Sequence, residues 1–184
     1  MSESTEVMII SNETIEINNL VVNSCQNFLV IDDEPHLRES IASFIEMFGF
    51  TGHIHQASCL REAKKILSYE KVDYIISDWN LPDGRGISLL KAIRKSKRFS
   101  DIPFLMVTAD DSVSSMILAS QYGGSDYLVK PFTLEQFKNK IADGWKTHVI
   151  PTLEEVQTLK QKILDLKEEN ELLRDKLKKI QEIL

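Results

Sequence analysis

The stretch of sequence that decides the fold is Phe28-Leu29-Val30-Ile31-Asp32-Asp33, a short apolar run that ends in two carboxylates. A run this short, apolar and β-branched is typical of a strand that is buried on both faces of a parallel sheet. Beyond it, apolar residues recur at spacings of three and four, which predicts an amphipathic helix over residues 36–48. The pattern thus starts with a strand followed by a helix.

The same alternation of apolar run and amphipathic stretch continues to residue 147. Further strands are predicted at 50–54, 72–77, 102–107 and 126–129, and further helices at 59–69, 87–97, 112–122 and 133–146. Five such units predict an α/β fold of the flavodoxin-like type, with a doubly wound, five-stranded parallel sheet. Ligands of such sheets bind outside the carboxyl ends of the strands, where the chain order reverses.

Polar residues follow four of the predicted strands. Asp32 and Asp33 follow the first strand, and Asp78 follows the third. Because the carboxyl ends of parallel strands share one edge, we expect these carboxylates to converge, and Mg²⁺ is a cation that suits such oxygen ligands. Thr108 and Lys130, at the ends of the last two strands, add a hydroxyl and an ammonium group. The predicted edge is therefore suited to a phosphoryl group.

Each of these residues has a simpler interpretation when it is taken alone. An Asp after a strand usually caps the next helix, and Lys130-Pro131 could form only a turn. The coincidence of all of them at the ends of four different strands favours a site.

With these residues in place, the sequence resembles the receiver domain of two-component response regulators over residues 28–147, in the style of the single-domain chemotaxis type. The motifs that carry the resemblance are Phe28-Leu29-Val30-Ile31-Asp32-Asp33-Glu34, Ser77-Asp78-Trp79-Asn80-Leu81-Pro82, Val107-Thr108-Ala109 and Tyr127-Leu128-Val129-Lys130-Pro131-Phe132. One departure is the segment Asp83-Gly84-Arg85, which places a base where an acid is common before Gly86.

The resemblance implies a chemical role for each site residue. Asp78 would accept a phosphoryl group from a sensor histidine kinase, a phosphotransfer protein or a small phosphodonor. Mg²⁺ would be held by Asp32, Asp33, Asp78 and the main-chain carbonyl of Asn80. Lys130 would bind the phosphoryl oxygens through a site that includes a cis peptide bond to Pro131. Such a domain is a phosphoacceptor that assists its own phosphorylation and dephosphorylation, and not an enzyme in the usual sense.

The resemblance also implies a conformational switch. Thr108 would move inward to hydrogen-bond the phosphoryl group, and Tyr127 would turn inward behind it. The switch requires that the phosphorylated site bind one conformation better than the other.

Residues 151–184 carry a heptad pattern after Pro151, a residue tolerated in the first turn of a helix. The a positions are Val156, Ile163, Asn170, Leu177 and Leu184, and the d positions are Leu159, Leu166, Leu173 and Ile180. A single polar residue at an a position is typical of a parallel, two-stranded coiled coil. We therefore expect a homodimer through this segment; the alternative is a single helix folded back on the receiver.

The rest of the composition excludes several classes of protein. Residues 1–27 contain acids but no Lys or Arg, and they favour a flexible extension over a hairpin with strands at 7–10 and 14–17.

The net charge of the chain is −6, and no segment has the excess of basic residues that binding to nucleic acid requires. No apolar run approaches the roughly 20 residues of a membrane span. We expect a cytoplasmic protein without a disulfide framework, since it has two cysteines.

Two functions agree with this organisation. The first is a response regulator that relays phosphorylation through a dimeric coiled coil. The alternative is the regulatory part of a larger dimeric enzyme, such as a receiver-controlled diguanylate cyclase, with its output domain beyond residue 184.

Overall fold

The first of two compact units, Met1–Val149, is built around a five-stranded parallel sheet between two layers of helices. The computed structural model describes residues 8–11, 14–18, 20–109, 121–122, 126–148 and 161. The strands of this sheet are β4 (Phe28–Ile31), β5 (Ile54–Ala57), β6 (Tyr74–Asp78), β9 (Phe104–Thr108) and β10 (Asp126–Val129). Their order is β10-β9-β6-β4-β5, and every neighbouring pair is parallel. The predicted doubly wound, flavodoxin-like sheet is confirmed.

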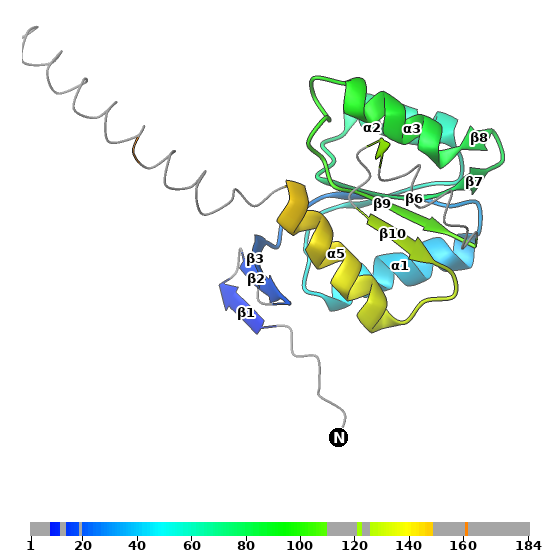
Figure 1. Ribbon diagram of the computed structural model, residues 1–184. Coiled ribbons are helices and arrows are strands. Elements are labelled where there is room, and N and C mark those ends of the chain that lie inside the picture. Colours follow the sequence, from blue (N-terminus) through cyan, green and yellow to red (C-terminus); the bar gives the residue numbers. More distant parts are fainter. Residues whose placement is uncertain are drawn as a thin grey trace, which may run out of the picture. The chain divides into compact units, whose positions relative to one another are not determined.

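Helices cover both faces of this sheet (Figure 1). They are α1 (Pro35–Met47) and α5 (Leu134–His148) on one face, and α2 (Leu60–Tyr69) and α3 (Gly86–Lys95) on the other. Alternate residues of a strand point to opposite faces, so Val30 and Ile76 pack towards α1 and α5, while Leu29 and Ile75 pack towards α2 and α3. Burial on both faces is why the central strands read as continuous apolar runs.

The second strand lies later in the sequence than expected, at Ile54–Ala57 and not at 50–54. Phe50 is apolar because it packs against Phe28 and Trp145 from a loop. Gly52 follows it, where a Cβ atom would lie 2.1 Å from the carbonyl oxygen of Gln26. Residues 50–53 thus form a tightly packed loop, and β5 starts directly after them.

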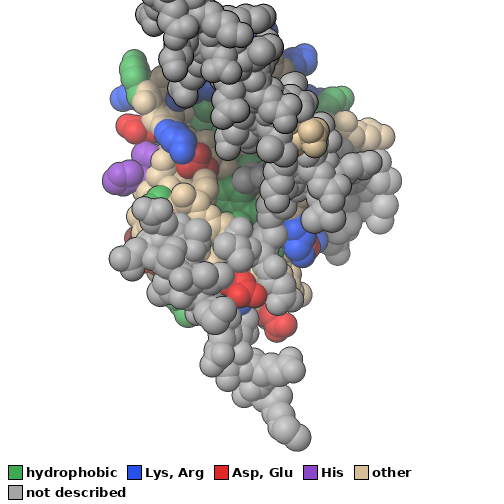
Figure 2. Space-filling model, turned by 90° about the vertical axis from the view of Figure 1, so that its left-hand side faces the viewer, with side chains coloured by type: hydrophobic (Ala, Val, Ile, Leu, Met, Phe, Trp, Pro, Cys, Tyr) green, Lys and Arg blue, Asp and Glu red, His purple; other side chains and the backbone are tan. Residues whose placement is uncertain are grey.

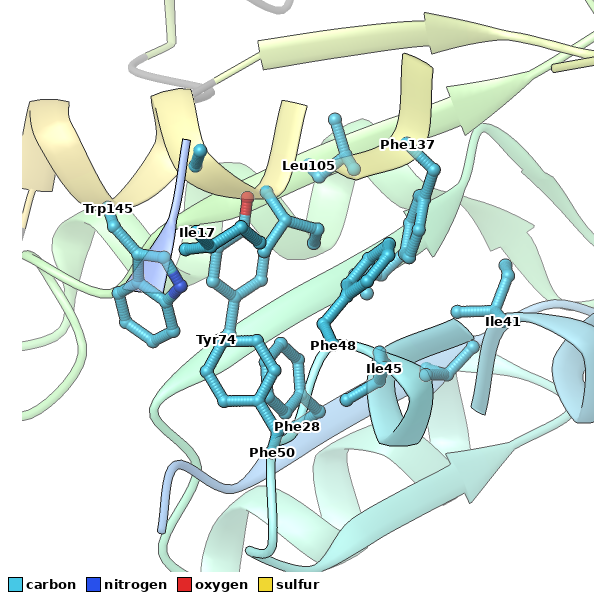
Figure 3. Packing of buried hydrophobic residues seen from close by; sticks show 14 of the residues in the cluster. Ile17, Phe28, Ile41, Ile45, Phe48, Phe50, Tyr74, Leu105, Phe137 and Trp145 are labelled. Atoms are coloured by element: carbon cyan, nitrogen blue, oxygen red, sulfur yellow. The ribbon is translucent and has the colours of Figure 1, made fainter. Parts of the chain in front are cut away.

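The expectation of a flexible N-terminal extension was wrong for the residues that the structure describes there. An antiparallel sheet forms from β1 (Met8–Ser11), β2 (Thr14–Ile17) and β3 (Leu20–Asn23). Ile15, Ile17 and Val22 are buried in the cluster that also contains Trp145 of α5 (Figure 3). Burial of these side chains offsets the entropy of ordering the segment.

Two expected elements lie outside the described residues. These are most of the helix at 112–122 and, apart from residue 161, the coiled coil at 151–184. Among the described residues, no helix has the length and apolar character needed to cross a membrane.

Candidate functional site

Three carboxylates meet at the carboxyl edge of the central sheet. Asp32 and Asp33 follow β4, and Asp78 is the last residue of the neighbouring strand β6. From β4 the chain first forms β5 on one side and then returns to form β6 on the other side, so the strand order reverses at this point of the sheet. Asp32 and Asp78 are buried, Asp33 is exposed, and one oxygen from each lies within 4.8 Å of the other two. The clustering expected from the strand ends is present.

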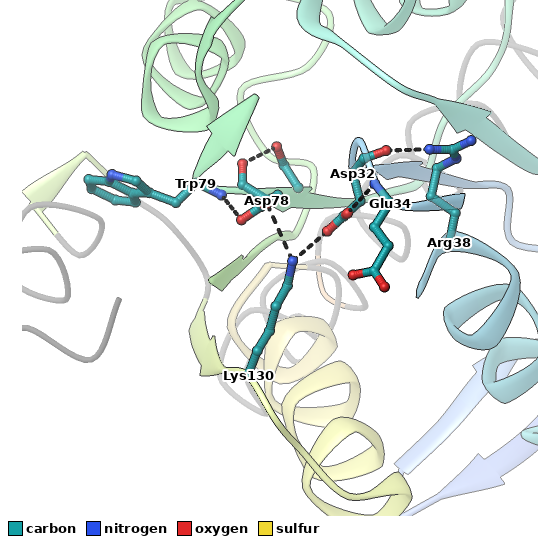
Figure 4. A network of polar contacts seen from close by, with 7 residues as sticks. Asp32, Glu34, Arg38, Asp78, Trp79 and Lys130 are labelled. Carbon is teal, nitrogen blue, oxygen red and sulfur yellow. Dashed lines mark hydrogen bonds and ion pairs between the residues drawn. The ribbon is translucent and has the colours of Figure 1, made fainter. Parts of the chain in front are cut away.

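Lys130 brings an ammonium group to these carboxylates (Figure 4). Its Nζ donates a hydrogen bond to Asp32 Oδ2 at 2.6 Å and lies 3.3 Å from Asp78 Oδ2. The backbone of Lys130 is fixed as well, because its N–H donates to the carbonyl of Thr108 at 2.7 Å. The peptide bond between Lys130 and Pro131 is cis.

Asp32 is held by the start of α1 as well as by Lys130. The N–H of Glu34 donates to Asp32 Oδ1 at 2.9 Å, and the Arg38 guanidinium donates to the main-chain carbonyl of Asp32 at 2.5 Å. Asp32 therefore has both carboxylate oxygens and its carbonyl engaged, which fixes its orientation. Sequence reasoning did not identify Arg38.

The two carboxylate oxygens of Asp78 have different surroundings. Oδ1 accepts a hydrogen bond from the N–H of Trp79 at 2.6 Å, and Oδ2 faces Lys130. The carbonyl of Asp78 accepts from the Ser77 hydroxyl at 2.9 Å. A Cβ atom on Gly86 would lie 2.1 Å from that same carbonyl, so only glycine lets α3 begin this close to Asp78.

The site destabilises its own negative charge. Burial raises the pKa of Asp78, Lys130 acts in the opposite direction, and the charge of Asp32 raises it further. Burial by itself would lower the pKa of Lys130, but its hydrogen bond and ion pairs with Asp32 and Asp78 outweigh that effect, and the pKa is raised. Lys130 stays charged, but one ammonium group cannot balance three carboxylates. A divalent cation fits this donor set.

Comparison with known proteins agrees with this geometry. Residues 28–142 match the family model of the response regulator receiver domain. The chain belongs to the response regulator receiver family. Members of this family are phosphoacceptors and bind Mg²⁺ at an acidic pocket, and they interact with histidine kinases or phosphotransfer proteins. The suspected family is thus confirmed.

Three similar proteins illustrate the extent of the match. The chemotaxis protein CheY of Pseudomonas aeruginosa is 37% identical over 113 residues, which are 61% of this chain and 90% of that protein. The solved structure of the chemotaxis response regulator CheY4 of Vibrio cholerae has a TM-score of 0.60 and 27% identity, covering 65% of this chain and 98% of that one. The beryllofluoride-activated NtrC4 receiver domain dimer has a TM-score of 0.60 and 29% identity, covering 66% and 98%.

The receiver domain carries a hairpin directly after Asp78 that sequence reasoning did not predict. Strands β7 (Asn80–Leu81) and β8 (Gly84–Arg85) pair antiparallel, with Asn80 opposite Arg85. At the turn, the Asp83 carboxylate accepts hydrogen bonds from the N–H groups of Leu60 and Arg61, at 2.8 and 2.9 Å. Asp83 therefore caps α2 from a distant loop and connects α2 to the segment that carries Asn80.

The two residues expected to switch lie on the neighbouring strands β9 and β10. Thr108 is fully buried at the end of β9, and it pairs in register with Val129 of β10. Tyr127 is half-buried and packs against the cluster on the α2 and α3 side. Asn80 is exposed, two residues after Asp78. The structure thus places Thr108 at the same sheet edge as Asp78, with Tyr127 two residues before the end of the adjacent strand.

Proposed function

We propose that this protein is a response regulator of a two-component system and that Asp78 is its phosphoacceptor. The observation that carries the proposal is the pair formed by Asp78 Oδ2 and Lys130 Nζ, 3.3 Å apart, beside the carboxylates of Asp32 and Asp33. An oxygen nucleophile and a cation for the phosphoryl oxygens are then adjacent.

The chemistry is a transfer to the Asp78 carboxylate. One of its oxygens attacks the phosphorus, an O–P bond forms, and the P–N bond of a phosphohistidine breaks. The leaving imidazole keeps the electron pair of that bond. Oδ2 is the better nucleophile, because Oδ1 is held by the N–H of Trp79. Lys130 then binds an oxygen of the phosphoryl group, while Asp32 keeps the ammonium group in position.

Mg²⁺ would be held by Asp32, Asp33 and Asp78 with the carbonyl of Asn80, and would offset the negative charge of the phosphoryl group. Thr108 would hydrogen-bond the phosphorylated site and Tyr127 would follow it. The protein would act in the cytoplasm, with a histidine kinase or phosphotransfer protein as its phosphodonor. The heptads of residues 151–184 support a relay through a parallel coiled-coil homodimer, and the NtrC4 receiver is itself described as a beryllofluoride-activated dimer.

Phosphorylation by acetyl phosphate in the presence of Mg²⁺ tests the first part. The full chain and the control Asp101→Asn, which changes an exposed acid in a turn, should both be labelled on a phosphate-affinity gel. Asp78→Asn should not be labelled. Equal labelling of Asp78→Asn would exclude Asp78 as the acceptor.

Sedimentation velocity with and without beryllofluoride tests the relay. A dimer under both conditions would mean that phosphorylation changes the arrangement of an existing dimer. A dimer only with beryllofluoride would make assembly the signal. A monomer under both conditions would contradict the coiled-coil homodimer and leave the acceptor role intact.

A further inference from the structure

Two histidines lie side by side on the edge of the central sheet, away from the phosphorylation site. His53 comes directly before β5, and His55 is its second residue. Their ring centroids are 6.1 Å apart, with the ring planes tilted by 41°. Figure 2 shows histidine gathered at one place on this face of the molecule. The receiver chemistry described above uses neither residue.

The backbone places both rings on the same face of the sheet. Residues two apart on a strand point to the same face of the sheet. Ile54, which lies between the two histidines, packs against the hydrophobic cluster on the α1 and α5 face, so both histidines point to the other face. The position of His53 is fixed on both sides, because its N–H donates to Asn27 Oδ1 at 2.9 Å and its carbonyl accepts from the N–H of Phe28 at 2.8 Å. His55 pairs in register with Leu29. Both imidazoles are thus carried by an ordered backbone.

The surroundings of the pair favour a cation. Beside His55 is a hollow of about 300 Å³, which it lines together with residues of α2 and the segment that follows. The charged residues of this hollow are Glu62, Glu70 and Lys65, so two carboxylates face one ammonium group. β5 is the outermost strand of its sheet, so no neighbouring strand of the described residues covers the outer edge of the pair.

We propose that His53 and His55 form a second metal site, which binds one Zn²⁺ or Cu²⁺ ion per chain. Imidazole nitrogen suits these borderline metals, whereas Mg²⁺ prefers the oxygens of the acidic site. Two imidazoles that bind one ion at about 2.0–2.1 Å have ring centroids roughly 5–6 Å apart, so a small rotation of each ring is sufficient. Among the described residues, three or more ligands converge only at Asp32, Asp33 and Asp78. Water would complete the coordination of the ion at the histidine pair.

Calorimetric titration of the full chain with ZnCl₂ tests the proposal. Excess Mg²⁺ occupies the acidic site, and a Cys25→Ser background removes the exposed thiol, which is a competing zinc ligand. The variants are His53→Gln and His55→Gln, and the matched control is His36→Gln, which changes a highly exposed histidine on α1. Circular dichroism checks that each variant is folded.

We expect one Zn²⁺ per chain in the background protein and in His36→Gln, and loss of that binding in both His53→Gln and His55→Gln. Titration with CuCl₂ should give an electron paramagnetic resonance signal with two coordinated nitrogens, reduced to one in either variant. The proposal is overturned if no saturable binding occurs, if one ion binds per two chains, or if either variant retains the full affinity.

Discussion

The two ends of strands β4 and β6 are chemically opposite. At their amino ends stand Phe28 and Tyr74, whose stacked rings are 5.5 Å apart. Four residues later the same strands reach Asp32 and Asp78, which share the ammonium group of Lys130. Apolar packing at one end accompanies unbalanced negative charge at the other. Stability and chemistry are therefore separated along one pair of strands, as expected when a functional site departs from the rules that stabilise a fold.

The aromatic end brings together rings from elements that are distant in sequence. Trp145 of α5 packs on Tyr74 at 4.9 Å and on Phe28 at 6.2 Å between ring centroids. The N-terminal sheet covers the same cluster with Ile15 and Ile17, both almost completely buried. Mutations at the two ends should therefore separate loss of stability from loss of phosphorylation.

The largest effect on stability is expected from Trp145→Ala. Removing a fully buried tryptophan leaves a cavity and should lower the free energy of unfolding by about 3–5 kcal/mol. Chemical denaturation measures the loss. Phosphorylation of the folded fraction at low temperature should persist, because Trp145 lies at the opposite end from Asp78.

The control for this change is Met47→Ala, since Met47 is exposed and its replacement should alter stability by less than about 0.5 kcal/mol. If Trp145→Ala were as mild as Met47→Ala, the aromatic end would not be the stabilising one.

Gly144→Ala should produce the next largest loss. The added Cβ atom would lie 2.2 Å from the Tyr74 hydroxyl oxygen and 2.9 Å from the ring carbon that bears it. Overpacking of this kind costs about 1–3 kcal/mol and outweighs the gain of about 1 kcal/mol from replacing a helical glycine. Thermal unfolding of Gly144→Ala, Tyr74→Phe and the double variant checks the cause. The double variant should recover part of the loss, and strictly additive losses would contradict the contact.

These contacts also show which parts of the fold were predictable from sequence. β4 and β10 were predicted at their observed bounds, because their apolar runs are local signals. β5 was misplaced because its residues are less apolar than Phe50, which lies in the preceding loop and packs against Phe28 and Trp145. The N-terminal hairpin was considered but not preferred, because Ile15 and Ile17 are buried in a cluster with α5, more than a hundred residues away in sequence, and no periodicity encodes that contact.

The site also has some features that were predictable from sequence and others that were not. The convergence of Asp32, Asp33 and Asp78 follows from topology alone, since each ends or follows a strand of one parallel sheet. The cap formed by Asp83 on α2 does not, because it joins residues 22 and 23 positions apart and leaves no mark in the local pattern. Capping partners from distant loops are set by tertiary structure.

Asp83→Asn should have a smaller effect. It tests a carboxylate near the charged end of the strands whose ionised form is expected to stabilise the fold. The N–H groups of Leu60 and Arg61 lower the pKa of Asp83 below its usual 3.8. A lowered pKa in the folded state means that the ionised group adds stability above the usual value, and that this is lost as the pH falls through the lowered pKa. The variant should melt a few degrees below the wild type at pH 7, and the gap should narrow below about pH 4.

A melting temperature of Asp83→Asn equal to that of the wild type at pH 7 would contradict the role of this carboxylate as a cap. Circular dichroism at 222 nm is the appropriate measurement, because it reports on the helix that loses its cap.

The smallest effect, and the one of opposite sign, is expected from Asp78→Asn in buffer without Mg²⁺. Burial raises the pKa of Asp78 above its usual 3.8, so the folded protein binds this proton more tightly than the unfolded chain does. The ionised carboxylate therefore lowers stability at neutral pH, and the variant should melt at a slightly higher temperature than the wild type. As the pH falls through the raised pKa, the wild type takes up the proton and the two melting temperatures should approach each other. Adding Mg²⁺ at pH 7 should raise the melting temperature of the wild type more than that of the variant, because it neutralises a charge that Asn lacks. Destabilisation by Asp78→Asn without Mg²⁺ would show that the carboxylate contributes to the fold, and that the two ends of β6 do not differ as the contacts indicate.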